Sequence, residues 1–191
     1  RIDYKGQELI RLNIGAAEKA IERLVANGAE SIAVCFLWSI VNDVHEKQLA
    51  EILRKKYPKL FYTLSSEVAP YIGEYERSAT TVFNAYIGPK ISTYLQNLQR
   101  VLKDQGLQRE PLIMQAYGGV LGIEATCNAV GVIESGPAAG IVGTRFLGEH
   151  IGEKNILATD MGGTTFKVSL VRDGVVERDY KPVILRYNIL S

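Results

Sequence analysis

The sequence predicts an α/β fold for most of the chain and an antiparallel β-meander at its C-terminal end. A nearly unbroken apolar run at residues 31–39 is typical of a strand covered on both faces, as in a parallel sheet. Strand and helix patterns then alternate, which is the signature of an α/β fold. Near the end, the dipeptides Gly162-Gly163 and Asp173-Gly174 separate short strands and predict hairpins. This change of pattern divides the chain into residues 1–119 and residues 120–191.

The first elements follow from periodicity and end signals. Residues 15–27 carry an apolar face at helical spacing, and Asn27-Gly28 ends the helix. The strand at 31–39 comes next. Asp43 and Glu46 have the spacing of a capping box, which predicts a helix that runs to about Lys56. A short strand at 61–65 completes a strand–helix–strand unit.

A long helix is predicted over residues 74–105. Its Gly88-Pro89 pair predicts a kink or a split, because proline lacks the N–H of the helical ladder. The apolar stripe expected to pack inward comprises Val82, Tyr86, Ile91, Tyr94, Leu95, Leu98, Val101 and Leu102. A strand at 111–117 follows and ends in Gly118-Gly119.

The rest of the chain is predicted as one helix and three strands. Ser135-Gly136-Pro137 opens a helix to about His150, with proline at the first helical position. The strands are predicted at 155–161, 165–172 and 175–180. In the second of them, Phe166, Val168 and Leu170 alternate inward, while Thr165, Lys167 and Ser169 share the polar face.

Composition narrows the function classes. The 191 residues are 47% hydrophobic and 23% charged, with a net charge of +1, as in ordinary globular proteins. No basic stripe is present, so a nucleic-acid partner is not expected. Apolar runs of about ten residues are too short to cross a bilayer, and the absence of a signal peptide favours the cytoplasm. The chain begins at Arg1 rather than methionine, which predicts an internal piece of a longer protein.

The clearest chemical motif is Asp160-Met161-Gly162-Gly163-Thr164-Thr165. Adjacent glycines let phosphate oxygens approach backbone N–H groups, and the two threonines add hydroxyl donors. Asp160 suits a Mg²⁺ ion held mostly through its waters. The alternative is a plain glycine-rich β-turn with a solvated aspartate. A Walker loop is excluded, because no Gly-Lys-Ser/Thr sequence opens a helix.

This hairpin resembles the phosphate-binding hairpins of the actin-like ATPase superfamily. The run from Ser31 to Val171 further resembles the hydantoinase A / 5-oxoprolinase family. The matching pieces, in order, are Ser31-Ile32-Ala33-Val34, Asn42, His45-Glu46, Glu74-Tyr75-Glu76-Arg77, Thr80-Thr81, Asn84-Ala85-Tyr86, Met114-Gln115, Gly118-Gly119-Val120, Ser135-Gly136-Pro137-Ala138-Ala139-Gly140 and the hairpin itself.

The resemblance implies a two-lobed enzyme that depends on ATP and Mg²⁺. Members open cyclic amides by phosphorylating the carbonyl, and relatives are subunits of biotin-independent acetone and acetophenone carboxylases. Residues 1–119 would then form the C-terminal part of the first actin-like lobe, and residues 120–191 the start of the second. The family's first hairpin would lie upstream of Arg1, so no catalysis is expected from this piece alone. A second subunit or fused domain is expected as partner.

The resemblance also bears on individual residues. Ser135 and Gly136, at a helix start that favours anions, are expected to line the nucleotide cleft, or else to form an ordinary cap. Gly118 and Gly119 either admit substrate or phosphate, or simply turn the chain. Glu76 and Arg77 are candidate substrate-side groups, although acids at a helix start also have a purely structural use.

Lys167 departs from the family pattern, which commonly has aspartate two residues after the second threonine. One hypothesis is that Lys167 contacts phosphate directly; the other is a surface lysine on a strand. Three functions follow from the sequence. They are an ATP-dependent cyclic amide hydrolase acting on a small cyclic amide, a subunit of an ATP-dependent ketone carboxylase, and a non-catalytic actin-like nucleotide-binding module.

Overall fold

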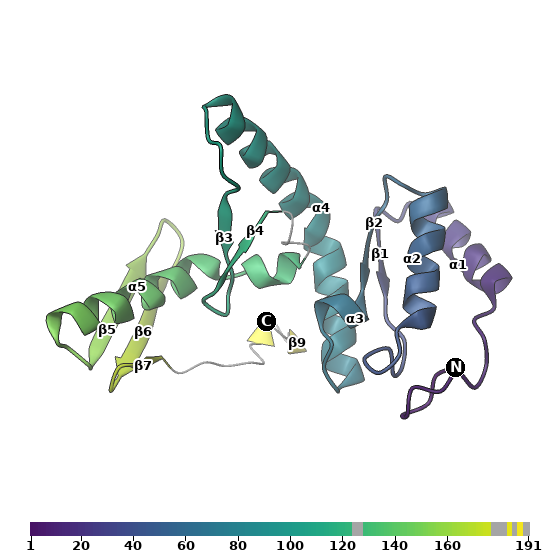
Figure 1. Cartoon of the computed structure of the whole chain (residues 1–191), viewed down its shortest axis with the longest axis horizontal. Helices are drawn as coiled ribbons and strands as arrows, with labels where there is room; N and C mark the ends of the chain where they lie inside the picture. The colour runs from purple at the N-terminus through teal and green to yellow at the C-terminus, as the bar shows by residue number, and fades with distance from the viewer. Residues whose placement is uncertain (124–127, 177–182, 185–186, 189–191) are drawn as a thin grey trace. The chain divides into compact units, whose positions relative to one another are not determined.

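The computed structural model of the chain describes residues 1–123, 128–176, 183–184 and 187–188, and has mixed α/β structure (Figure 1). The chain divides into two compact units, which are described separately. The first is Arg1–Thr93 together with the segment that holds β8 (Val183–Ile184) and β9 (Tyr187–Asn188), and the second is Tyr94–Tyr180. This division falls inside one helix rather than at residue 119, and the assignment of residues 1–119 and 120–191 to lobes stays a prediction.

The first unit is built on a parallel strand pair. Its elements are α1 (Ile14–Ala26), β1 (Ser31–Val34), α2 (Val44–Lys56), β2 (Phe61–Leu64), α3 (Ser65–Val68) and the N-terminal part of α4 (Glu74–Asp104). In the register, Ser31 lies opposite Phe61 and Val34 opposite Leu64. The predicted strand–helix–strand unit is therefore confirmed, with helices α1 and α2 on one side of the pair and α4 on the other (Figure 1).

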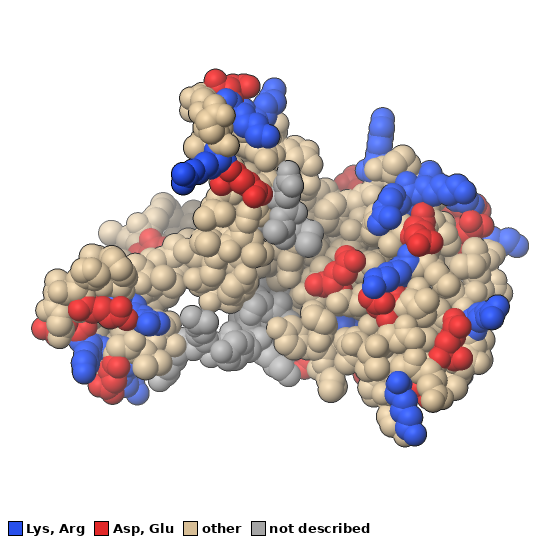
Figure 2. Space-filling model, in the orientation of Figure 1, with Lys and Arg blue, Asp and Glu red and all other residues tan. Residues whose placement is uncertain are grey.

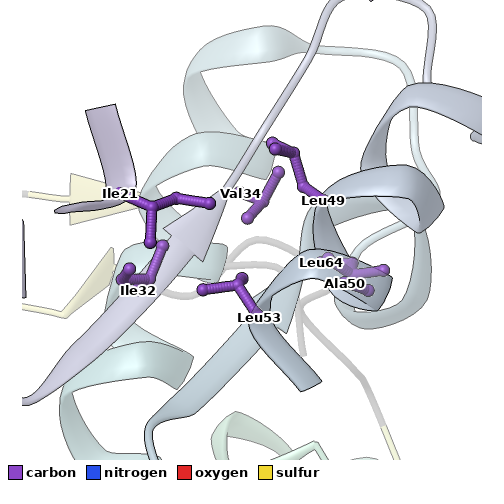
Figure 3. Packing of buried hydrophobic residues seen from close by; sticks show 7 residues of the cluster. All are labelled: Ile21, Ile32, Val34, Leu49, Ala50, Leu53 and Leu64. Carbon is purple, nitrogen blue, oxygen red and sulfur yellow. The ribbon is translucent and has the colours of Figure 1, made fainter. Parts of the chain in front are cut away.

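The core of this unit lies between α1, α2 and the two strands. Figure 3 shows its buried side chains pointing toward one another: Ile21, Ile32, Val34, Leu49, Ala50, Leu53 and Leu64. Leu53 and Leu64 have almost no exposed surface. Burial of such a leucine contributes about 1.5–3 kcal/mol, so these contacts hold α2 on the strands.

Two local predictions in this region are wrong. β1 ends at Val34 instead of running to Ser39, and the predicted strand could not include Trp38, whose left-handed conformation (φ 61°) is not extended. The predicted capping box also fails. Asp43 is the N-cap of α2 but makes no side-chain cap bond, and the Glu46 carboxylate is fully buried and bonded elsewhere. Asp43 instead pairs with Lys47 at 2.9 Å.

The long helix α4 is continuous through Gly88-Pro89, so the helix is not split there, and the kink that was the other predicted outcome stays a prediction. Gly88 serves close packing: a Cβ atom built on it would overlap the ring of Phe61 on β2. The buried face of the N-terminal part of α4 is also largely polar. It comprises Arg77, Thr80, Thr81, Asn84 and Ala85, whereas Val82 and Tyr86 of the predicted apolar stripe are exposed.

The second unit contains two antiparallel arrangements. Its elements are the C-terminal part of α4, β3 (Leu112–Met114), β4 (Val120–Gly122), the 3₁₀ helix η1 (Ala129–Val132), α5 (Ser135–Ile151), β5 (Ile156–Met161), β6 (Phe166–Arg172) and β7 (Val175–Val176). β3 pairs with β4, and the order β5-β6-β7 confirms the predicted meander. Residues 177–180 of the last predicted strand lie outside the described residues.

The turn at Asp173-Gly174 forms as predicted, since both residues have positive φ (51° and 77°). Helix α5 begins at Ser135 after Glu134 as N-cap, so Pro137 is its third residue rather than its first. Proline is still accommodated there, because the N–H groups of the first turn have no intrahelical acceptor.

The covered face of the β5–β6 pair is the opposite of the predicted one. Phe166, Val168 and Leu170 are exposed, while Val171 is buried and Lys167 and Ser169 are half-buried. The reason is the position of α5, which packs on the other face: a Cβ atom on its Gly148 would overlap Ile156 of β5.

On the face shown in Figure 2, acidic and basic side chains are interleaved. Among the described residues, no helix is both long enough and apolar enough to cross a membrane.

Candidate functional site

The glycine turn joins β5 to β6 in the second unit. Met161 lies opposite Phe166, which leaves Gly162–Thr165 as a four-residue loop. The Gly162 N–H donates to the Thr165 carbonyl at 3.0 Å and closes this loop. Neither glycine has positive φ, and a Cβ atom on either would meet nothing within 4 Å. The glycines therefore leave open space beside the backbone rather than relieve strain, which suits the approach of a phosphate group.

A charged cluster lies directly beside this turn. Asp160 and Lys167 are cross-strand partners, and the Lys167 ammonium forms an ion pair with the Glu134 carboxylate. Glu134 has a left-handed backbone (φ 61°) and directly precedes α5. The ion pair therefore ties the start of α5 to the turn end of the β5–β6 pair.

The start of α5 adds backbone donors at the same end of the unit. The first intrahelical bond runs from the Ala138 N–H to the Glu134 carbonyl. Ser135 and Gly136 stand in the first turn, where N–H groups lack intrahelical acceptors and the helix dipole favours anions. Space beside Gly136 is open. The Lys167–Glu134 ion pair thus places the start of α5 at the turn end of the β5–β6 pair, and a phosphate contact of Ser135 or Gly136 stays a prediction.

Gly118 and Gly119 form the turn between β3 and β4. Gly118 has φ 85°, its N–H donates to the Gln115 carbonyl, and the Gln115 N–H donates to the Gly119 carbonyl. A Cβ atom on Gly119 would overlap the ring of Tyr117, so this side chain fills the space beside the glycine. These contacts describe a chain-turning role, and a contact with ligand stays a prediction.

Glu76 and Arg77 lie in the other unit, on the first turn of α4. The Arg77 guanidinium is buried and donates to the Phe36 carbonyl at 2.9 Å and the Tyr71 carbonyl at 3.2 Å. Its Nε is buried without a hydrogen-bond partner among the described residues. Glu76 is half-buried, with its carboxylate against Gly73. The substrate-side role of both residues stays a prediction.

Sequence reasoning missed the buried carboxylate of Glu46. It accepts hydrogen bonds from the Phe36 N–H (2.9 Å), the Ser65 hydroxyl (2.7 Å) and the Ser66 N–H (2.9 Å). Ser39 extends the network with its hydroxyl 3.1 Å from that of Ser65. The network lies at the carboxyl ends of β1 and β2, the edge where open α/β sheets bind ligands. Two signals in the sequence touched this residue, its spacing from Asp43, which also fits a cap, and the His45-Glu46 piece of the family resemblance, and neither predicted a buried network.

Metal ligands are sparse in the described part of the chain. No group of three or more His, Cys, Asp or Glu residues gathers there in a way that could hold an ion. Asp160 lies beside the glycine turn, and its role toward Mg²⁺ stays a prediction.

Comparison with known proteins now decides the family. A family model described as hydantoinase/oxoprolinase matches residues 77–191, and a model of the hydantoinase/oxoprolinase N-terminal region matches residues 1–57. The chain belongs to the hydantoinase/oxoprolinase family. The resemblance read from the motifs is thereby confirmed.

Two curated members of the hydantoinase/oxoprolinase family are similar to almost the whole chain. The alpha subunit of caprolactamase from Pseudomonas jessenii is 32% identical over 99% of this chain, which spans 27% of that protein. The gamma subunit of acetophenone carboxylase from Aromatoleum aromaticum is also 32% identical over 99% of this chain, which spans 26% of it. The chain therefore covers only about a quarter of the length of these relatives.

Solved structures of the family share the fold. A nucleotide-free structure of acetone carboxylase, from work on ATP-dependent acetone carboxylation, covers all of this chain with a TM-score of 0.88 and 29% identity. The ATP-dependent caprolactamase of Pseudomonas jessenii also covers all of it, with a TM-score of 0.83 and 30% identity. The matched region is 27% and 28% of those chains, respectively.

Proposed function

We propose that the complete protein uses ATP to activate the carbonyl of a cyclic amide for hydrolysis, and that this chain supplies one of its phosphate-binding turns. The observation that supports the proposal is the open Gly162-Gly163 turn beside the Asp160–Lys167 pair, with Lys167 ion-paired to Glu134 at the start of α5. Similarity to a caprolactamase described as ATP-dependent supports both the nucleotide and the amide.

The residues at the turn have distinct proposed roles. The Gly162 N–H is committed to the turn itself, so phosphate oxygens are bound by other amides of the loop and by the hydroxyls of Thr164 and Thr165. Ser135 and Gly136 add first-turn N–H groups. Asp160 holds Mg²⁺ through water. When bound, ATP supplies the phosphoryl group that activates the carbonyl oxygen.

We place this chain in an actin-like ATPase fold, at the junction of its two lobes. The resemblance of the hairpin to those of the superfamily supports this, as does the division of the chain into two compact units. The relatives are named as alpha and gamma subunits, which supports a second subunit as partner.

A ketone carboxylase subunit is the second candidate. It is favoured by the TM-score of 0.88 to acetone carboxylase and by the similarity to the acetophenone carboxylase gamma subunit. Both candidates use the same phosphate turn, so the turn does not distinguish them.

The deciding experiment measures ATP hydrolysis and products of the complete protein with its partner subunit. The substrates compared are 5-oxoproline, caprolactam, N-methylhydantoin, and acetone with bicarbonate. We expect a cyclic amide to stimulate ATP hydrolysis and to give the ring-opened acid. Stimulation by acetone with bicarbonate alone would instead establish the carboxylase, and ATP binding with no stimulation by any of them would indicate a non-catalytic module.

A variant tests the turn itself. Gly163→Val places a branched side chain in the open space beside the loop, where a phosphate group is proposed to approach. We expect at least a tenfold weaker ATP affinity, which corresponds to a loss of about 1.4 kcal/mol in binding free energy. Gly143→Ala, within α5 and also in open space, is the matched control and should leave ATP affinity unchanged. Unaltered affinity of a folded Gly163→Val protein would refute the phosphate role.

A further inference from the structure

A cavity of about 570 Å³ lies in the first unit, whereas the glycine turn belongs to the second. It is bounded by the N-terminal segment and by the loop that follows β1, at the carboxyl end of that strand. Residues that line it include Ile10, Arg11, Phe36, Leu37, Trp38 and His45. This volume is within the range of small-molecule sites in proteins, and its position is the edge at which α/β sheets bind ligands.

The wall after β1 is fixed from behind by the buried polar network. The Phe36 N–H donates to Glu46, and the Phe36 carbonyl accepts from the Arg77 guanidinium and the Ser39 hydroxyl. Trp38 holds a left-handed backbone, and its carbonyl accepts from the N–H groups of Val41 and Asn42. Such a conformation costs a non-glycine residue energy and clusters at functional sites. The wall is therefore preorganised.

The opposite wall is fastened to the same loop region and to α2. The Glu8 carboxylate lies 2.8 Å from Nε2 of the buried His45, and the Asn42 amide donates to the Gly6 carbonyl at 2.8 Å. These contacts hold the N-terminal segment across the cavity, so its two sides keep a defined separation.

The chemistry of the lining is apolar with a cationic edge. Isoleucine, leucine and aromatic residues supply most of it, and the two arginines Arg1 and Arg11 also line it. Glu8 is engaged by His45, and the Asp3 carboxylate accepts the N–H groups of Lys5 and Gln7. Within the described part of the chain, Arg11 has no acidic partner. A ligand with an apolar body and one negative group would complement both features.

We propose that this cavity binds a small apolar carboxylic acid. Its body packs between Leu37, Trp38 and Ile10, and its carboxylate binds the Arg11 guanidinium. All of its lining residues belong to the first unit, and the proposal does not depend on the proposed hydrolase or carboxylase activity.

The test measures binding to the complete protein by ligand-observed NMR with three probes. Cyclohexanecarboxylate has both the apolar body and the charge, cyclohexanecarboxamide has only the body, and acetate has only the charge. We expect saturable binding of cyclohexanecarboxylate, at least tenfold tighter than that of either other probe, because the site pairs a charge-assisted hydrogen bond with apolar burial.

Three variants locate the site. Arg11→Gln and Leu37→Asp should each weaken cyclohexanecarboxylate binding about tenfold, the first by removing the cation and the second by adding a repelling charge at an exposed position. Arg23→Gln, an exposed arginine in the last turn of α1, is the matched control and should bind as the parent does. No saturable binding, equal binding of the three probes, or unchanged binding by both folded variants would overturn the proposal. ATP affinity should be unaffected in either variant, so this result is independent of the glycine turn.

Discussion

At the scale of single residues, the largest difference from the sequence-based predictions is Glu46. A carboxylate near a helix start usually caps it, and the spacing from Asp43 matched that role. The structure instead places Glu46 where two backbone N–H groups and a serine hydroxyl converge after β1 and β2. Sequence spacing cannot reveal this, because the donors come from residues 10 to 20 positions away.

Replacement of Glu46 by glutamine tests this network. The amide keeps the shape but loses the charge and turns an N–H₂ group toward existing donors, so we expect a loss of about 1–3 kcal/mol in the free energy of unfolding. Urea denaturation measures it. Glu51→Gln, an exposed change on the same helix, should stay within about 0.5 kcal/mol. Equal effects of the two changes would show that the Glu46 bonds do not stabilise the fold.

Lys167 has two competing roles, a direct contact with phosphate or that of a surface lysine, and a substitution can distinguish them. Its ion pair with Glu134 is substantially exposed, so Lys167→Met should cost no more than about 1 kcal/mol of stability. A phosphate contact would add a loss of ATP affinity of about tenfold or more, and we expect that loss. Titration of the complete protein with ATP and Mg²⁺ measures it. Glu134→Gln is the control for the ion pair alone, and equal ATP affinity of Lys167→Met and the parent would leave only the surface-lysine interpretation.

At the scale of elements, helices with strong end signals were predicted closely, and packing details were not. α1 ends at Ala26, directly before the predicted stop at Asn27-Gly28, where Gly28 has φ 82°. Gly88-Pro89 carries a breaking signal of the same strength, yet α4 continues through it. Gly88 packs closely against the ring of Phe61, and this tertiary contact cannot be read from the local sequence.

Gly88→Ala tests this explanation of α4. In a free helix the change would stabilise by about 0.5–1 kcal/mol, but here the new methyl overlaps the Phe61 ring, so we expect a net loss of about 1–3 kcal/mol. Gly143→Ala in α5, where the space is open, should instead stabilise by up to about 1 kcal/mol. Thermal unfolding of both variants measures the contrast. Stabilisation by Gly88→Ala would show that the glycine is not needed for packing.

At the scale of the whole molecule, the alternation of strands and helices and the final meander were predictable because period and turn chemistry are local. The predicted inward faces failed where apolar side chains are exposed, as at Val82 and Tyr86 on α4 and at Phe166 and Val168 on β6. The chain spans about a quarter of the length of its relatives. The apolar pattern of a sequence reflects every contact that buries side chains in the complete protein. A chain of about a quarter of that length therefore does not contain a partner for each apolar face.

A pair of leucine substitutions distinguishes the core of this chain from those exposed faces. Leu53 has no exposed surface, so Leu53→Ala should cost about 2–5 kcal/mol through lost burial and a residual cavity. Leu170 is 46% exposed on the uncovered face of β6, and Leu170→Ala should cost no more than about 1 kcal/mol in the 191-residue chain. Denaturant unfolding of both variants measures the difference. A cost for Leu170→Ala as large as that for Leu53→Ala would show that this face of the sheet is covered in solution, because only a buried side chain loses that much on truncation.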